Sequence, residues 1–154
     1  MTGNHSTESK KQLIRDYGWN ESKTCAHDYL LGTIVKILER VNVPEAAQIL
    51  DAGCGGGYVM HELYKKGYEN IWGFDASESG IDVSQNSYPE IKDRFKIHDA
   101  YDILLPESFP GRNYDLVLSV EVIEHLYSPK KYLENIYRWL KPGGYLLITT
   151  PYHG

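Results

Sequence analysis

The chain has 154 residues, of which 42% are hydrophobic and 24% charged, and its formal net charge is −5. This balance is typical of one folded globular domain and excludes a disordered chain. Acidic and basic residues are interspersed, without a stripe of lysine and arginine, so we expect no nucleic-acid partner.

The sequence shows no membrane or export signal. Its longest apolar runs, 145–148 and 116–118, are far shorter than the ~20 residues of a membrane-spanning helix. Residues 1–11 are polar and lack the apolar centre of a secretory signal, and Cys25 and Cys54 give no disulfide framework. We therefore expect a cytoplasmic protein without a transmembrane segment and with a polar, flexible start at 1–11.

Residues 12–44 have the pattern of N-terminal helices. Apolar side chains recur there at three- and four-residue spacing, which is typical of helices with one apolar face. The residues that carry this pattern are Leu13, Ile14, Tyr17, Leu30, Leu31, Ile34, Val35 and Leu38.

From residue 45 to 154 short apolar runs alternate with helical segments. The pattern predicts strands near 48–52, 70–74, 94–98, 114–119 and 144–150, and helices near 57–66, 78–87 and 129–140. Ser128 is the expected N-cap of the last helix and Pro129 its first residue, and residues 141–144 end it. Right-handed crossovers make this series a doubly wound, Rossmann-like α/β sheet of five parallel strands in the order 3-2-1-4-5. Ligands of such sheets bind beyond the carboxyl ends of the strands.

Glycines dominate the turn after the first predicted strand. Residues 53–57 read Gly-Cys-Gly-Gly-Gly, more glycine than a tight turn alone demands, so the backbone can approach a nucleoside-containing ligand closely. A dinucleotide fingerprint starting at Gly53 would need a third glycine at position 58, where the chain has Tyr58. The acid before the loop, Asp51, suits a cationic amino-acid group better than a pyrophosphate.

This stretch resembles motif I of the class I S-adenosylmethionine-dependent methyltransferases. The resemblance implies that Asp51 and the backbone of Gly53 serve the methionine portion of S-adenosylmethionine. It also implies that Gly55 and Gly57 give the cofactor room.

The second predicted strand ends in Asp75, which lies 22 residues after Gly53. An acid about 20 residues beyond the glycine turn commonly binds ribose hydroxyls. Asp75 is therefore the strongest single cofactor candidate; the alternative is that it caps the following helix. Ala76, which comes next, and Val120, at the end of the fourth predicted strand, complete this part of the expected cofactor site.

The third predicted strand leads into Asp99, Ala100 and Tyr101. The family resemblance implies that Asp99 meets the adenine amino group and that the backbone amide of Ala100 meets a ring nitrogen. Tyr101 is a candidate to stack on the adenine, with simple loop packing as the alternative.

The segment after the fourth predicted strand carries Glu121, Glu124 and His125. If a helix starts there, the three side chains share one face, which suits a general base or a site for Mg²⁺ or another divalent cation. Together with 140–144 and 150–151, this segment resembles the ubiquinone-biosynthesis O-methyltransferases, and the resemblance covers residues 45–151. It implies a magnesium-type role. The alternative is that Glu121 lies near the cofactor, Glu124 favours a helix N-terminus and His125 packs.

The N-terminal helices resemble the aromatic-rich lid that covers the cofactor and shapes the acceptor pocket in related enzymes. The residues concerned are Tyr17, Trp19, His27 and Tyr29. Packing of a helix on the sheet is the alternative explanation for them.

The sequence therefore predicts an S-adenosylmethionine-dependent methyltransferase that acts on a small-molecule acceptor, with an oxygen atom as one option. Two alternatives are a non-catalytic S-adenosylmethionine- or nucleotide-binding module and an inactive methyltransferase fragment. A dinucleotide-dependent oxidoreductase is disfavoured by Tyr58.

The family sheet continues beyond the fifth strand, whereas this sequence stops there. We expect the sixth and seventh strands to be absent and the cofactor domain at 45–154 to be truncated. The fifth strand would then present an unpaired apolar edge. The alternative is that the N-terminal helices or a second copy of the chain cover this edge, which would make the 154 residues a complete enzyme, homodimeric in the second case.

Overall fold

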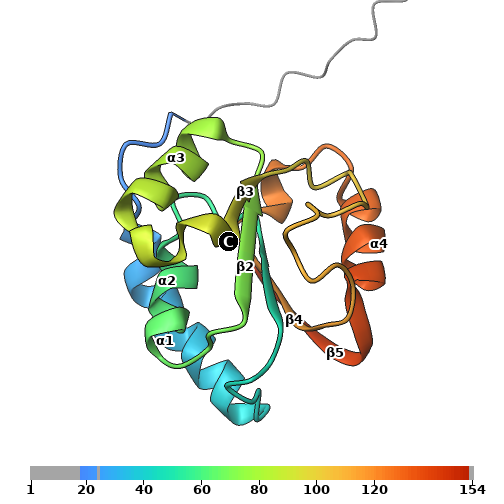
Figure 1. Ribbon diagram of the computed structural model, residues 1–154. Helices are drawn as coiled ribbons and strands as arrows, with labels where there is room; N and C mark the ends of the chain where they lie inside the picture. Colours follow the sequence, from blue (N-terminus) through green and yellow to red (C-terminus); the bar gives the residue numbers. More distant parts are fainter. Residues whose placement is uncertain (1–17, 24, 153–154) are drawn as a thin grey trace, which may run out of the picture.

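The computed structural model describes residues 18–23 and 25–152, in which strands and helices alternate as predicted (Figure 1). The strands are β1 (Ile49–Ala52), β2 (Ile71–Asp75), β3 (Phe95–Ile97), β4 (Tyr114–Val120) and β5 (Leu140–Thr149). The α-helices are α1 (Cys25–Arg40), α2 (Tyr58–Lys65), α3 (Glu78–Ser87) and α4 (Pro129–Trp139). Two 3₁₀ segments, η1 (Pro89–Arg94) and η2 (Ile123–His125), complete the described elements. The predicted helical residues Leu13, Ile14 and Tyr17 lie outside the described residues.

The five strands form one parallel sheet in the order β3-β2-β1-β4-β5. This confirms the predicted doubly wound sheet. Ile49 of β1 faces Ile71 of β2 on one side and Leu116 of β4 on the other, so β1 is central and all four of its residues are buried. Burial on both faces explains why its apolar residues do not alternate with polar ones.

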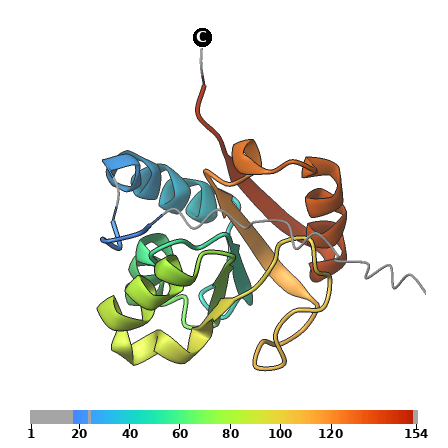
Figure 2. The same ribbon diagram turned by 90° about the horizontal axis from the view of Figure 1, so that it is seen from above.

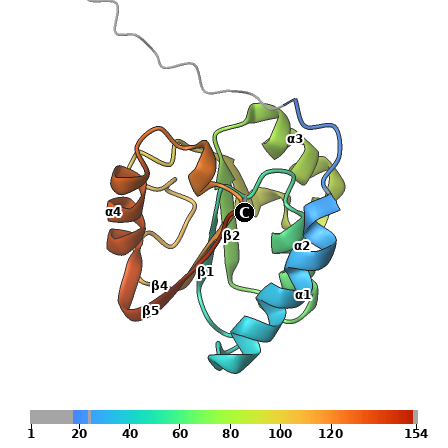
Figure 3. The same ribbon diagram turned by 180° about the vertical axis from the view of Figure 1, so that it is seen from behind.

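Helices cover both faces of the sheet, as the opposite views in Figures 1 and 3 show. Viewed from above in Figure 2, α1, α2 and α3 lie on one side of the strands and α4 on the other. On the first side Ile34 and Leu38 of α1 are buried, which confirms the apolar face expected for this helix. On the second side Trp139 of α4 packs edge-on against Phe74 of β2 at 5.6 Å between ring centroids. No helix in the described part of the chain is long and apolar enough to cross a membrane.

The transition from α4 to β5 differs from the prediction. Residues 141–144 were expected to form a turn before a strand at 144–150, but β5 begins directly after α4. Leu140 pairs with Tyr114 and Tyr145 pairs with Leu116, so the intervening residues form an irregularity inside the strand pair, with Gly143 at φ 79°. The glycines therefore mark a bulge, which needs the same backbone freedom as a turn.

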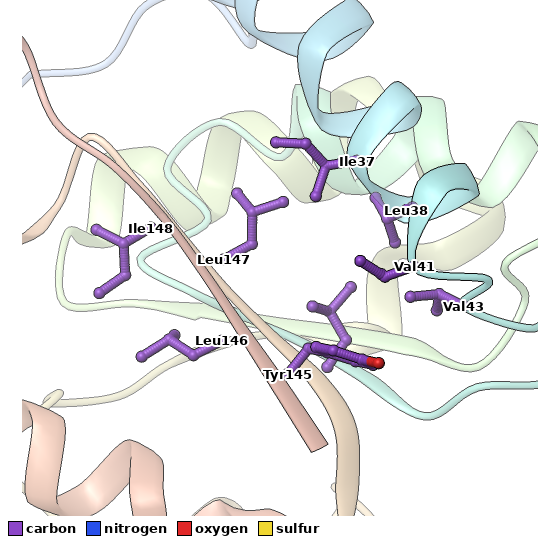
Figure 4. Close-up of a pocket in the computed structure, with 9 residues that line it drawn as sticks. Ile37, Leu38, Val41, Val43, Tyr145, Leu146, Leu147 and Ile148 are labelled. Carbon is purple, nitrogen blue, oxygen red and sulfur yellow. The ribbon is translucent and has the colours of Figure 1, made fainter. Parts of the chain in front are cut away.

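The outer edge of β5 is open among the described residues, because β5 pairs only with β4 there. Its apolar side chains include Tyr145, which is 49% exposed. A hollow lies between this strand and the end of α1 (Figure 4), and its volume is about 240 Å³. It is lined by Ile37, Leu38, Val41, Val43, Leu116, Tyr145, Leu146, Leu147 and Ile148. The sequence predicted this apolar edge.

Candidate cofactor and active site

The glycine loop connects β1 to α2 at the carboxyl edge of the sheet. Gly53, Gly55 and Gly57 have φ values of 91°, 51° and 80°, in the left-handed region that favours glycine. The amides of Gly53 and Cys54 both donate to the carbonyl oxygen of Phe74, at 2.8 and 2.9 Å. The loop is therefore held against the end of β2, where Asp75 lies.

Other side chains of the protein occupy the space where a Cβ of each of these glycines would lie. A Cβ on Gly53 would lie 2.5 Å from Val122, one on Gly55 2.6 Å from Trp19, and one on Gly57 2.7 Å from Phe95. The absence of a side chain at Gly55 and Gly57 lets Trp19 and Phe95 pack against the loop. The expectation that these two glycines also give the cofactor room stays a prediction.

Replacing Gly57 by alanine is expected to lower the free energy of unfolding by more than 2 kcal/mol, because overpacking adds about 1–3 kcal/mol to the strain of a positive φ. Gly32 is a matched control: it lies in α1, and a Cβ there would meet nothing within 4 Å. Gly32→Ala should stabilise the chain by about 0.5–1 kcal/mol. Urea unfolding of both variants measures this, and equal effects would refute the packing argument.

Asp75 ends β2 with both carboxylate oxygens engaged by backbone amides. Gly55 N–H donates to Oδ2 at 2.9 Å, and Ser77 N–H donates to Oδ1 at 2.8 Å. The alternative that Asp75 caps α3 is wrong, since the N-cap is Ser77, whose Oγ accepts from the amide of Gly80. These two amides hold the Asp75 carboxylate in a defined orientation at the end of β2.

Asp51 is the most unusual group of the site. It is only 2% exposed at the end of β1, and its Oδ1 has no hydrogen-bond partner. Burial, and secondarily the negative charge of Asp75, raise the pKa of Asp51 to about 7. An ionised carboxylate in such surroundings is unfavourable unless a cation lies beside it. The arrangement therefore fits a ligand that brings a positive charge to the glycine loop.

The expected adenine-binding residues follow β3 and are tied to α4. Asp99 Oδ1 accepts from the amide of Tyr101 at 2.8 Å, which forms a tight turn. Asn135 of α4, only 5% exposed, donates from Nδ2 to the carbonyl oxygen of Ala100 at 3.0 Å. Asn135 could not be predicted from the sequence, because a single asparagine on an amphipathic helix gives no signal of such a contact.

Tyr101 reaches the start of α4. Its hydroxyl accepts from the amide of Ser128 at 3.2 Å, and its ring centroid lies 4.5 Å from that of Tyr127. Ser128 is the residue before α4, as predicted, but its side chain makes no capping hydrogen bond. The contacts of Tyr101 support the loop-packing interpretation, and adenine stacking stays a prediction.

Glu121 lies outside any helix. A helix starting at Glu121 was the condition under which Glu121, Glu124 and His125 would share one face. The φ of Glu121 is 55°, its amide donates to the carbonyl oxygen and to Oγ1 of Thr149, and Thr149 Oγ1 donates to Glu121 Oε1 at 2.8 Å. Only Ile123–His125 form a single 3₁₀ turn. The end of β5 thus holds Glu121 in a conformation that non-glycine residues rarely adopt.

Glu124 and His125 form a separate pair, with Glu124 Oε1 3.8 Å from His125 Nε2. Among residues 18–23 and 25–152, no group of three His, Cys, Asp or Glu side chains is placed to hold a metal ion. The structure therefore pairs Glu121 with Thr149 and Glu124 with His125, rather than bringing all three together.

A family model for the methyltransferase domain matches residues 26–153. The chain belongs to this family. Membership confirms the class I S-adenosylmethionine-dependent methyltransferase domain expected from the glycine loop, and it agrees with the sheet order described above.

Relatives of this methyltransferase domain include longer proteins. A Coxiella burnetii protein named ubiquinone biosynthesis O-methyltransferase is 29% identical over 141 residues, which cover 90% of this chain and 58% of that protein. The solved structure of the cyclase SpnF has a TM-score of 0.69 at 22% identity, with 90% of this chain and 51% of that one covered. Magnesium protoporphyrin IX methyltransferase from Synechocystis, solved with bound S-adenosylmethionine, has a TM-score of 0.61 at 21% identity, with 74% and 54% covered. The two structures support the fold.

The residues present fit S-adenosylmethionine. The unpartnered oxygen of Asp51 suits the cationic methionine portion, and the carboxylate of Asp75, oriented by two amides, suits ribose hydroxyls.

Of the expected lid residues, Trp19 packs on the glycine loop and His27 stacks on Tyr58 at 5.3 Å between centroids, while Tyr29 is 65% exposed. His27 is partly buried by this packing, and burial lowers the pKa of its imidazole. Tyr17 lies outside the described residues.

Proposed function

We propose that this methyltransferase domain binds S-adenosylmethionine across the carboxyl ends of β1, β2 and β3 and transfers its methyl group to an oxygen of a small-molecule acceptor. The observation that carries the proposal is the buried carboxylate of Asp51 beside the glycine loop, whose Oδ1 has no hydrogen-bond partner. In this proposal Asp51 and Gly53 bind the methionine portion and Asp75 binds the ribose.

The charge at the loop supports this ligand over a dinucleotide. A pyrophosphate would bring negative charge toward Asp51 and Asp75, which already interact unfavourably with each other. Tyr58, at the position of the third fingerprint glycine, begins α2 and stacks on His27. The charge of the two acids favours a cationic ligand, and Tyr58 disfavours a dinucleotide.

The name of the Coxiella burnetii relative supports an oxygen as the acceptor atom. A hydroxyl group must lose its proton to become a strong nucleophile, and an imidazole can take it. We propose His125 as this base, because it lies in η2, beyond the carboxyl end of β4, and its side chain is 52% exposed there. Glu124, 3.8 Å away, would stabilise the protonated ring. S-adenosylmethionine supplies an electrophilic methyl group, and the protein's main task is to align the hydroxyl with it.

A divalent cation held by Glu121, Glu124 and His125 stays a prediction. Thr149 already binds the Glu121 carboxylate in the described structure, so Glu121 would have to give up that hydrogen bond to join the other two. This supports the base role of His125 over the metal role.

Calorimetry tests the cofactor part of the proposal. We expect the chain to bind S-adenosylhomocysteine and to show no heat with NAD; the reverse result would end the proposal. A screen of hydroxylated acceptors with S-adenosylmethionine labelled in its methyl group, read by mass spectrometry, tests transfer. Binding without transfer to any acceptor would instead support the non-catalytic module.

Two further expectations stay predictions. The apolar edge of β5 is the surface that a homodimer contact would cover. A cytoplasmic location rests on the sequence alone.

A further inference from the structure

Two chains of contacts connect Trp19 to Asp75, and each of them reaches a different carboxylate oxygen. The indole of Trp19 lies against Gly55, where a Cβ would be 2.6 Å from Cζ2, and Gly55 N–H donates to Asp75 Oδ2 at 2.9 Å. On the other side the backbone N–H of Trp19 donates to Ser79 Oγ at 3.0 Å, and Ser79 Oγ lies 3.1 Å from Ser77 Oγ. Ser77 N–H then donates to Asp75 Oδ1 at 2.8 Å.

We infer that Trp19 is a positioning residue for Asp75. The residue fills the space between the glycine loop and the start of α3, since a Cβ on Gly80 would lie 3.2 Å from its Cδ1. It thereby fixes the two amides that orient the carboxylate. A carboxylate held in one orientation loses little conformational freedom when it accepts hydrogen bonds from a ligand. Trp19 thus strengthens binding of a vicinal diol, such as the ribose of the proposed cofactor, without touching it.

The inference rests on the proposed cofactor. The Trp19 side chain also has a second possible role, which is direct contact with the ligand. Trp19 Nε1 is buried and has no hydrogen-bond partner among the described residues. An indole N–H in that state could instead donate directly to an anionic group of the ligand. The two roles differ in their dependence on Asp75, because only the positioning role acts through that carboxylate.

A double-mutant cycle with S-adenosylhomocysteine, measured by calorimetry, separates them. We expect Trp19→Ala to weaken binding about tenfold in the wild-type background and less than twofold in the Asp75→Ala background, because coupled residues are not additive. A 2′,3′-dideoxy analogue of the ligand provides the same test without the second mutation: Trp19→Ala should change its affinity less than twofold.

Two variants guard against a trivial loss of folding. Trp19→Phe keeps an aromatic ring on Gly55 and should bind within threefold of the wild type. Ser79→Ala removes the acceptor of the Trp19 backbone amide and the contact with Ser77 Oγ, and it should weaken binding a few-fold. Urea unfolding of every variant accompanies the titrations.

Two results would overturn the inference. A Trp19→Ala loss that persists at full size with Asp75→Ala and with the dideoxy analogue would mean direct contact. No loss in folded Trp19→Ala would mean packing alone. Failure of the wild type to bind S-adenosylhomocysteine would instead refute the proposed function.

Discussion

Asp51→Asn should stabilise the ligand-free chain at pH 8 and at the same time weaken its binding of S-adenosylhomocysteine. The Asp51 carboxyl is buried without a partner for Oδ1, and its pKa is raised from 3.8 to about 7. A change of that size corresponds to about 4 kcal/mol of destabilisation by the ionised form. Asparagine has nearly the same shape and no charge, so we expect a gain of up to about that amount in the free energy of unfolding.

The gain should depend on pH in a defined direction. Between pH 4 and 7 the folded chain holds a proton on Asp51 that the unfolded chain has released, so the wild type loses stability as the pH rises through this window. The advantage of Asp51→Asn should therefore be small near pH 4, grow toward pH 7 and stay constant above it. Urea unfolding of both proteins at pH 5, 6 and 8 measures the difference.

Binding should change in the opposite sense. The ammonium group of the ligand would lose a charged acceptor, and hydrogen bonds to charged groups contribute about 1.5–3 kcal/mol. We expect Asp51→Asn to weaken binding of S-adenosylhomocysteine by about 10- to 100-fold at pH 8. A more stable protein that binds less well identifies Asp51 as a group whose charge is retained for its ligand.

Asp115 is the matched control, because it is a paired carboxylate at the start of β4. Burial alone would raise its pKa, but hydrogen bonds from Lys141 and from the amide of Gln48 lower it. Asp115→Asn should therefore destabilise the chain at pH 8, with cofactor binding unchanged. If Asp51→Asn also destabilises, with no dependence on pH, the argument about an uncompensated buried charge is wrong.

The sheet could be predicted from the sequence pattern, because each buried strand is itself a short run of apolar residues. The run at 48–52 and the four others predicted five strands, and right-handed crossovers then restricted their order. The place of Asp75 at the end of β2 could also be predicted, because its distance from the glycine loop follows from the length of one β-α-β unit.

Contacts between distant segments could not be predicted in this way. Glu121 has a left-handed backbone because Thr149, 28 residues later, binds both its amide and its carboxylate. The sequence around Glu121 reads as a helix start, since nothing local opposes one. Likewise, Gly55 faces Trp19 from the N-terminal segment, and no spacing rule connects those two positions. Local patterns fix elements, whereas long-range packing decides where site side chains point.

His125→Ala is expected to lower the rate of methyl transfer by about 10²- to 10⁴-fold, the usual contribution of a general base. The acceptor is the one found in the labelled-methyl screen, at saturating cofactor. Affinity for S-adenosylhomocysteine should stay within threefold, because His125 is not among the proposed cofactor residues, most of which lie in the glycine loop, at the ends of β1 and β2 and after β3. The prediction therefore separates proton transfer from cofactor binding.

His61 gives the matched control for this last variant. It lies on α2 with Nε2 2.7 Å from Glu90 Oε1, so it forms a histidine–glutamate pair as His125 does, but away from the end of β4. His61→Ala should leave the transfer rate of the folded protein unchanged.

A chelator distinguishes the base role of His125 from the metal role. Loss of transfer in EDTA, restored by Mg²⁺ in the wild type, would favour a cation at Glu124 and His125. Activity indifferent both to EDTA and to His125→Ala would refute the two roles together, since alignment alone would then carry the reaction.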